Sequence, residues 1–311
     1  MERFKNILFV SLGNKEDAAA LDRANRLAVV NGAKITLLRV LEGLPAAASF
    51  LMSKEKLNEF QKATRELAQR DLDSLAQKID PSVKVSTTIS VGKPFFEIIR
   101  TVQISKHDVL IKAKIPAMTP HALDSTDLHL LRKCPVPIML LKPGRKKVLK
   151  RVMAAIDLDP EKPVTQKLHY QILKLATSLS EREKAELDIF HAWQSFSVST
   201  LQGPRFNLSS EEIMDVANKE RSLRKAWLED ALTPFEKSKI KIRTHLLDGD
   251  PAEVIPEFTR KRKTDLLVMG SLARGGLQGL LIGNTAERVL DTVNCSTLTI
   301  KPDDFICPIK G

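Results

Sequence analysis

A length of 311 residues is about twice that of a typical 150-residue domain, so two domains are expected. Hydrophobic residues make up 43% of the chain and charged residues 28%, a composition that excludes the disordered and fibrous classes. No apolar run approaches the roughly 18 residues that span a bilayer, and the chain starts without a signal-peptide pattern, so we expect a cytoplasmic protein with no membrane span.

The net charge of +11 raises the question of nucleic-acid binding, in which phosphate contacts dominate. One basic cluster, 142–151, surrounds Pro143-Gly144, where a linker would be solvated. Another, 260–263, falls where a helix should end and cations complement the helix dipole. One Tyr and two Trp leave no aromatic interleaving for base stacking. We therefore rank nucleic-acid binding below a solvated basic surface.

The sequence offers few candidates for catalysis, redox chemistry or metal binding. Cys134, Cys295 and Cys307 include no C-x-x-C pair, so we expect neither a disulfide framework nor a zinc ribbon, and Cys134 and Cys295 should be buried and reduced. The six histidines lack metal-ligand spacing, and the common hydrolase and phosphate-loop motifs are missing. We expect no enzyme, no catalytic residue and no metal, with slow nucleotide hydrolysis left open.

Taken in chain order, short apolar runs alternate with segments of helical spacing, and the pattern occurs twice. Residues 5–10 return as 150–156, Gly92-Lys-Pro94 returns as Gly249-Asp-Pro251, and Lys142-Pro143 returns as Lys301-Pro302. The expected strands are 7–10, 35–40, 83–89, 109–111, 138–141, 152–156, 187–190, 240–246, 266–269 and 297–300, and the longer helices are 18–30, 54–79, 165–179 and 211–232. The chain therefore reads as a duplication.

Strands that alternate with helices indicate βαβ units and a parallel sheet covered on both faces. The predicted fold class is α/β, with two tandem open doubly wound parallel five-stranded sheets. Two helix starts are marked clearly. Asp250-Pro-Ala-Glu253 combines an N-cap, a proline at the first helical position and a reciprocal glutamate, and Ser209-Ser-Glu-Glu212 has the pattern of a capping box.

Open parallel sheets bind ligands beyond the carboxyl ends of their strands, at the point where the winding reverses. If the reversal lies between the first and fourth strands, Asp157 and Gly270 face the ligand in the second half, and Leu12 and Ala113 hold these positions in the first. The glycines of 269–288 would let backbone amides approach an anion, and a helix over 284–290 would point its N-terminus at the same spot. The alternative is that these glycines only form a turn.

The segment resembles the signature of the ATP-binding universal stress protein family: a glycine, two residues, a second glycine, nine residues, then glycine and a hydroxyl residue. Gly270 and Gly283 match its first and third glycines, whereas Ala273 replaces the second glycine and Asn284 the hydroxyl residue. The resemblance implies that Asp157 contacts the base or ribose end of a nucleotide and that His191 and Ala192 lie where the backbone meets the base.

Both halves together resemble the tandem two-domain subgroup of that family, and 126–135 and 281–287 look like its own sequence. The resemblance implies an adenine nucleotide alpha hydrolase-like fold packed as an intramolecular pseudo-dimer. It also implies a cytoplasmic stress-response protein of nucleotide-binding descent, with no established enzymatic reaction. We expect two domains, 1–143 as a degenerate structural unit and 150–311 with a modified nucleotide-binding loop.

The first half departs from the nucleotide pattern, because Leu12 replaces the acid and 112–120 replaces the glycine loop with a segment containing two prolines. In the second half, Ser271, Arg274 and Thr285 would compensate for the two departures, although Arg274 equally suits a plain surface position. The candidate site comprises Asp157, His191, Ala192, Met269, Gly270, Ser271, Ala273, Arg274, Gly283, Asn284 and Thr285.

These observations predict a protein that binds a nucleotide or a nucleotide-linked small molecule in its second half, as a sensor or adaptor. No cofactor is required, and ATP is one possible ligand. The alternative is a purely structural adaptor with a vestigial pocket. A lipid-like ligand is less favoured: the apolar segments 43–52 and 193–206 that would hold it more often pack in a core or interface. An internal pseudo-dimer, with homo-oligomers possible, is the expected assembly.

Overall fold

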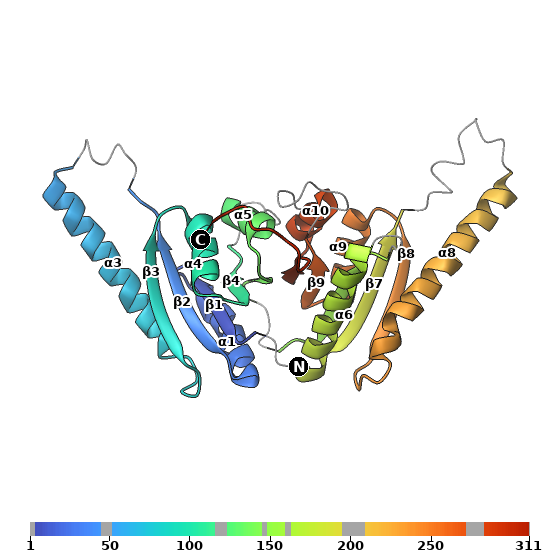
Figure 1. The fold of residues 1–311 in the computed structure, drawn as a ribbon, viewed down its shortest axis with the longest axis horizontal. Helices are drawn as coiled ribbons and strands as arrows, with labels where there is room; N and C mark the ends of the chain where they lie inside the picture. The colour runs from blue at the N-terminus through green and yellow to red at the C-terminus, as the bar shows by residue number, and fades with distance from the viewer. Residues whose placement is uncertain are drawn as a thin grey trace.

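The computed structural model describes residues 4–44, 52–115, 123–144, 148–158, 163–194, 209–271 and 283–310. Strands and helices alternate through both halves (Figure 1). The first half contains β1 (Asn6–Ser11), α1 (Asp17–Asn31), β2 (Lys34–Leu41), α3 (Lys54–Ala76), β3 (Val85–Val91), α4 (Pro94–Ile104), β4 (Val109–Ala113), α5 (Ser125–Lys133) and β5 (Ile138–Leu141). The second contains β6 (Arg151–Ile156), α6 (Pro163–Glu183), β7 (Glu186–Trp193), α8 (Ser210–Leu232), η1 (Thr233–Phe235), β8 (Ile242–Asp248), α9 (Pro251–Arg262), β9 (Leu266–Gly270), α10 (Asn284–Thr292) and β10 (Ser296–Ile300).

All ten strands form one sheet in the order β3-β2-β1-β4-β5-β10-β9-β6-β7-β8. Within each half the strands are parallel, and β1 lies between β2 and β4 just as β6 lies between β7 and β9, which confirms the expected reversal. The halves join through β5 and β10, which pair antiparallel, with Met139 opposite Leu298. The two predicted five-stranded sheets are thus halves of one sheet, because each fifth strand supplies the partner that the other's edge lacks.

Helices cover both faces of this sheet, and neighbouring residues of each strand point to opposite faces. In β1, Ile7 and Phe9 pack in one core with α1, α3, α6 and α8, while Leu8 and Val10 pack in the other with α4, α5, α9 and α10. Each core contains residues of both halves. No described helix is long and apolar enough to cross a membrane.

Two of the predicted strands begin slightly later than expected. Asp80 forms a turn before β3, since its carboxylate accepts hydrogen bonds from the Ser82 amide at 2.9 Å and the Ser82 hydroxyl at 2.6 Å. β3 therefore starts at Val85, and β8, its counterpart, starts at Ile242. The expected starts rested on a single apolar residue each, Val83 and Ile240, and both of these residues precede the strand.

The predicted helix caps are present with one difference. Ser209 and Glu212 form the complete capping box at the start of α8. Asp250 caps α9 by accepting from the Ala252 amide at 2.9 Å, with Pro251 at the first helical position. The expected reciprocal role of Glu253 was wrong. Its carboxylate lies 3.8 Å from Arg288 of α10, which also pairs with Asp250 at 2.8 Å and draws the two helices together.

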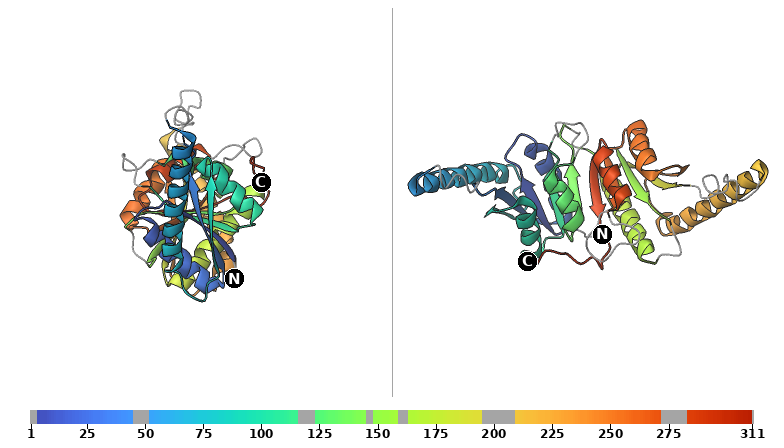
Figure 2. Two further views of the ribbon diagram at one scale, coloured as in Figure 1. Left: turned by 90° about the vertical axis from the view of Figure 1, so that its left-hand side faces the viewer. Right: turned by 90° about the horizontal axis from the view of Figure 1, so that it is seen from above.

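Polar contacts across the junction hold the two halves together beside the paired strands. Seen from above in Figure 2, the C-terminal segment crosses from the second half to the first. The contacts are Leu123 N to Asp291 Oδ1 at 2.7 Å, Arg132 to Glu287 at 2.8 Å, Lys301 Nζ to the Cys134 carbonyl at 2.8 Å, Gln103 Nε2 to the Ile309 carbonyl at 2.9 Å, and the pairs Arg23–Glu183 and Arg182–Asn31.

The cysteines agree with the expected burial. Cys134 is fully buried and Cys295 is 3% exposed, and no disulfide joins the three cysteines, all of which are described. Burial raises the pKa of the Cys134 thiol to about 11. A thiol with so high a pKa holds little reactive thiolate at neutral pH.

Candidate functional site

The carboxyl ends of β6 and β9 lie side by side because Ala155 pairs with Met269 in the parallel ladder. Asp157 follows β6 directly, and Gly270 is the last residue of β9. The backbone amide of Gly283 donates to the Ser271 carbonyl at 3.2 Å, which brings the two ends of the intervening segment together. Ala273 and Arg274 lie within 272–282, outside the described residues.

Ser271 is the most informative side chain at this point. It is fully buried, and its amide donates to the Ile300 carbonyl at 3.2 Å. Within the described part of the chain its hydroxyl has no hydrogen-bond partner. Leaving a buried hydroxyl unpaired costs about 1–3 kcal/mol, so such a group calls for an explanation, and a ligand or a water that completes the site supplies one.

The N-terminus of α10 lies at the same place, because Gly283 is its N-cap. Glycine provides no side-chain cap, so the first-turn amides of α10 stay available to an anion. Asn284 and Thr285 occupy that first turn and are exposed. Gly283 and these two residues therefore present polar groups beside Ser271.

Gly270 has a role in packing that was not expected from the sequence. A Cβ atom added to it would lie 2.8 Å from Leu168 Cδ2 and 3.7 Å from Ile172 Cδ1, both on α6. A side chain at this position would require Leu168 to shift. The signal was present in the helical spacing of these apolar residues, although spacing alone does not tell which strand a helix touches.

Asp157 is half-buried, and its backbone amide donates to Nε2 of His169, a buried residue of α6, at 3.2 Å. His169 was not among the predicted site residues. Because this histidine holds the backbone of Asp157, the second half places an acid at the strand end with a fixed main chain. The first half has no acid at this position.

Three of the predicted site residues support the site from below. The side chains of His191, Ala192 and Met269 are at most 6% exposed. His191 Nδ1 lies 3.1 Å from the Ile156 carbonyl, and Arg224 Nη1 of α8 lies 3.3 Å from His191 Nε2. Met269 packs in the core together with Ala286. These side chains therefore shape the strand ends from within the core.

The equivalent place in the first half is occupied by the protein's own groups. The Asp17 carboxylate accepts from Ser11 Oγ at 2.8 Å, the Leu12 amide at 2.9 Å and the Gly13 amide at 2.8 Å. A Cβ atom added to Gly13 would lie 2.5 Å from the guanidinium carbon of Arg39. An acid, an arginine and the turn itself therefore fill the space at the end of β1.

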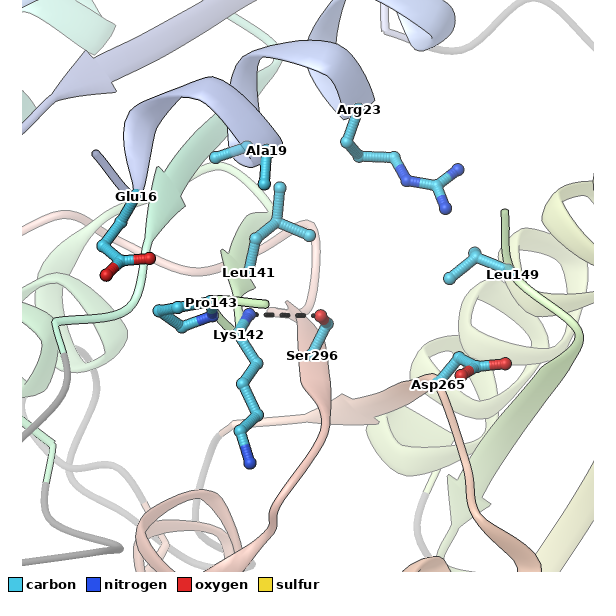
Figure 3. Close-up of a pocket in the computed structure, with 10 residues that line it drawn as sticks. Glu16, Ala19, Arg23, Leu141, Lys142, Pro143, Leu149, Asp265 and Ser296 are labelled. Carbon is cyan, nitrogen blue, oxygen red and sulfur yellow. Dashed lines mark hydrogen bonds between the residues drawn. The ribbon is translucent and has the colours of Figure 1, made fainter. Parts of the chain in front are cut away.

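Two cavities lined by described residues lie away from the candidate site. The one in Figure 3 encloses about 30 Å³ between α1, β5 and β10, beside the hydrogen bond from the Lys142 amide to Ser296 Oγ at 3.2 Å. A cavity of this size has room for water but not for a nucleotide. The other, of about 630 Å³, is open and basic and lies at the end of α9, where Arg260 and Lys263 complement the helix dipole. This second cavity lies at the amino ends of β6 and β9, beside Arg151 and Asp265, and thus at the opposite end of the strands from Asp157 and Gly270.

The sequence and the fold both have known counterparts. The profile of the Universal stress protein family matches residues 3–142 and 149–301. "Universal stress protein E" of Photorhabdus laumondii is 30% identical over 100% of this chain and 99% of its own, and that of Escherichia coli is 26% identical over 100% and 98%. A putative universal stress protein from Pseudomonas aeruginosa has the same fold, with 25% identity, a TM-score of 0.65, and coverage of 97% of this chain and 95% of its own. The chain belongs to the universal stress protein family and carries the family's domain twice.

Proposed function

We propose that the chain is a stress-response protein that binds one nucleotide, or nucleotide-linked small molecule, per chain, as a sensor or adaptor. The ligand lies in the second half, between Asp157 and the segment 270–285. The observation that carries the proposal is the buried Ser271 hydroxyl, which has no hydrogen-bond partner among the described residues and lies where the sheet reverses its winding.

The surroundings of Ser271 suit a phosphate at one end of the ligand. The uncapped amides at the start of α10 favour an anion, and Gly283 adds no side chain to block it. Asp157 follows the neighbouring strand and suits hydroxyl or amino groups at the other end. The role of Asp157 is carried over from the family signature that Gly270 and Gly283 match.

Binding at one site per chain follows from the contrast with the first half. There, Asp17 and Arg39 occupy the end of β1, so a ligand would have to displace a hydrogen-bonded network. We therefore assign a structural role to the first domain, 1–143, and the ligand to the second, 150–311.

A specific contact favours the alternative of a vestigial pocket in an adaptor protein. Leu168 packs directly on Gly270, so that glycine serves helix packing whether or not a ligand binds. The two proposals differ in what the unpaired Ser271 hydroxyl meets: a ligand group in one case, and a bound water in the other.

Native mass spectrometry of gently prepared protein, followed by calorimetric titration with ATP and AMP, tests the proposal. We expect one nucleotide-sized mass per chain. Ser271→Ala should weaken binding by about fivefold or more, since one hydrogen bond contributes about 1 kcal/mol. Ser105→Ala, which removes a hydroxyl at the end of α4, is the control and should leave binding unchanged. A chain that carries no ligand and gives no heat with either nucleotide has a vestigial pocket.

A further inference from the structure

A line of contacts runs from the long helix α8 to the backbone around Asp157. Arg224 of α8 lies with Nη1 3.3 Å from His191 Nε2. His191 is fully buried, and its Nδ1 lies 3.1 Å from the Ile156 carbonyl and 3.4 Å from the Leu158 amide. These last two residues flank Asp157 on both sides.

Both nitrogens of the His191 ring have partners. A guanidinium only donates hydrogen bonds, so Nε2 accepts from Arg224. On the other side of the ring, Nδ1 lies between the Ile156 carbonyl and the Leu158 amide, which donates to it. The ring thus connects a cation on α8 with the main chain of the candidate site.

Arg224 is itself held firmly. Its guanidinium carbon lies 5.4 Å from the centroid of the Trp193 ring and 5.7 Å from that of Trp227, within the range of cation–π attraction. Glu220, one turn earlier on α8, accepts from Arg224 Nε at 3.2 Å and from Nη2 at 2.9 Å. The Trp193 ring also stacks on His191, with ring centroids 6.0 Å apart and an interplanar angle of 13°.

The first half lacks this connection. Arg39 occupies the place of His191, because it pairs with Ser11 as His191 pairs with Ile156, and its Nη1 donates to the Ser11 carbonyl at 3.3 Å. On α3, Ala68 stands as far from the N-cap Ser53 as Arg224 does from the N-cap Ser209. In the first half the arginine belongs to the strand itself, and among the described residues no side chain of α3 makes a hydrogen bond to the end of β1. In the second half the corresponding cation, Arg224, is on the helix.

We propose that Arg224 and His191 are positioning residues through which α8 sets the conformation of residues 156–158, so that binding at the second-half site and the position of α8 are coupled. The proposal rests on the proposed function for its ligand, while the coupling within the protein stands on the contacts above. α8 extends outward from the sheet (Figures 1 and 2), so a partner that holds this helix would alter the ligand site without touching it.

Hydrogen exchange of the full chain tests the internal coupling with no ligand present. In Arg224→Ala, the peptide that carries residues 156–158 should exchange about tenfold faster, the factor expected when one charge-assisted hydrogen bond is lost. Arg224→Lys should restore much of the protection, because lysine also donates to Nε2. Arg221→Ala, which removes an exposed arginine one turn earlier, should exchange like the wild type. Equal exchange in Arg224→Ala and wild type overturns the proposal.

The ligand side of the coupling is read with ATP as the probe. The chain has two tryptophans, Trp193 and Trp227, and both contact Arg224, so intrinsic fluorescence reports on this contact. ATP should change the emission of the wild type with the affinity that calorimetry gives, and Arg224→Ala should bind about tenfold more weakly. Unchanged affinity in Arg224→Ala overturns the coupling and leaves the proposed function intact. If ATP and AMP do not bind the wild type at all, the proposed function fails, and the exchange experiment still decides the positioning role.

Discussion

The same place in the two halves, where β4 or β9 meets the following helix, is built from opposite chemistry. In the first half Lys112 is fully buried and pairs with Asp127 at 2.7 Å and with Asp124 at 3.1 Å. In the second half the corresponding residues are Met269 and Ala286, which pack in the apolar core, and the N-cap Gly283.

This difference extends to the helix N-termini of the two copies. In the first half Asp124 caps α5 with its own carboxylate, at 2.6 Å from the Asp127 amide, so the helix N-terminus is already satisfied. In the second half Gly283 leaves the N-terminus of α10 without a side-chain cap. The N-terminus of α5 is therefore satisfied within a charged network, whereas the N-terminus of α10 lies beside an apolar core and has no side-chain cap.

The largest effect is expected when a side chain closes the second site. In Gly283→Val the branched side chain would stand at the N-cap, where the proposed phosphate lies, so ATP binding should be lost altogether. Calorimetry gives the affinity, and circular dichroism shows whether the fold is kept. A folded Gly283→Val protein that binds ATP like the wild type would place the site elsewhere.

The next largest effect is expected from breaking the buried ion pair of the first half. Lys112→Met leaves Asp127 buried without its partner, so the free energy of unfolding should fall by about 3–5 kcal/mol. Adding Asp127→Ala gives the first half the Met–Ala pair of the second, and should recover most of the loss. Urea unfolding of both variants measures this. If the double variant were no more stable than Lys112→Met, the apolar pair of the second half could not replace the ion pair of the first.

The pH dependence of stability follows from the same carboxylate. Burial raises the pKa of Asp127 to about 6, although the Lys112 ammonium opposes the shift. A folded pKa above the unfolded value means that the folded state binds the proton more tightly, so the carboxylate's contribution to stability increases as pH falls from 6 towards 4. The unfolding free energy of the wild type minus that of Asp127→Asn should therefore increase by about 1 kcal/mol for each unit by which the pH falls in that window. A difference that is flat with pH would contradict the raised pKa.

The smallest effect is expected from restoring the full signature in the second half. Ala273→Gly together with Asn284→Ser should raise ATP affinity by about fivefold, since one neutral hydrogen bond contributes about 1 kcal/mol. Titration calorimetry on the double variant and the wild type makes the comparison. Lower affinity would mean that the two departures adapt the site to a different ligand.

The candidate site was predicted unevenly from the sequence. Asp157, Gly270, Ser271 and Gly283 were assigned from strand ends and spacing, and the structure places their described backbones together. The side chains of His191, Ala192 and Met269 lie below the site, because β7 and β9 are covered on both faces by helices. His169 and Arg224 were not predicted, because each contacts the strand ends from a helix that is remote in the sequence.

The order of the elements and the duplication could be predicted from the sequence alone, whereas the reversal of winding was a condition that the strand order fulfils. The first two follow from short-range patterns: apolar runs of strand length, helical spacing, and caps such as Ser209 and Asp250. Only the tertiary structure decided that β5 and β10 join the halves into one sheet, that Leu168 covers Gly270, and that Arg224 meets His191. Such contacts depend on which surfaces meet when the layers pack, and the local sequence pattern does not predict which surfaces these are.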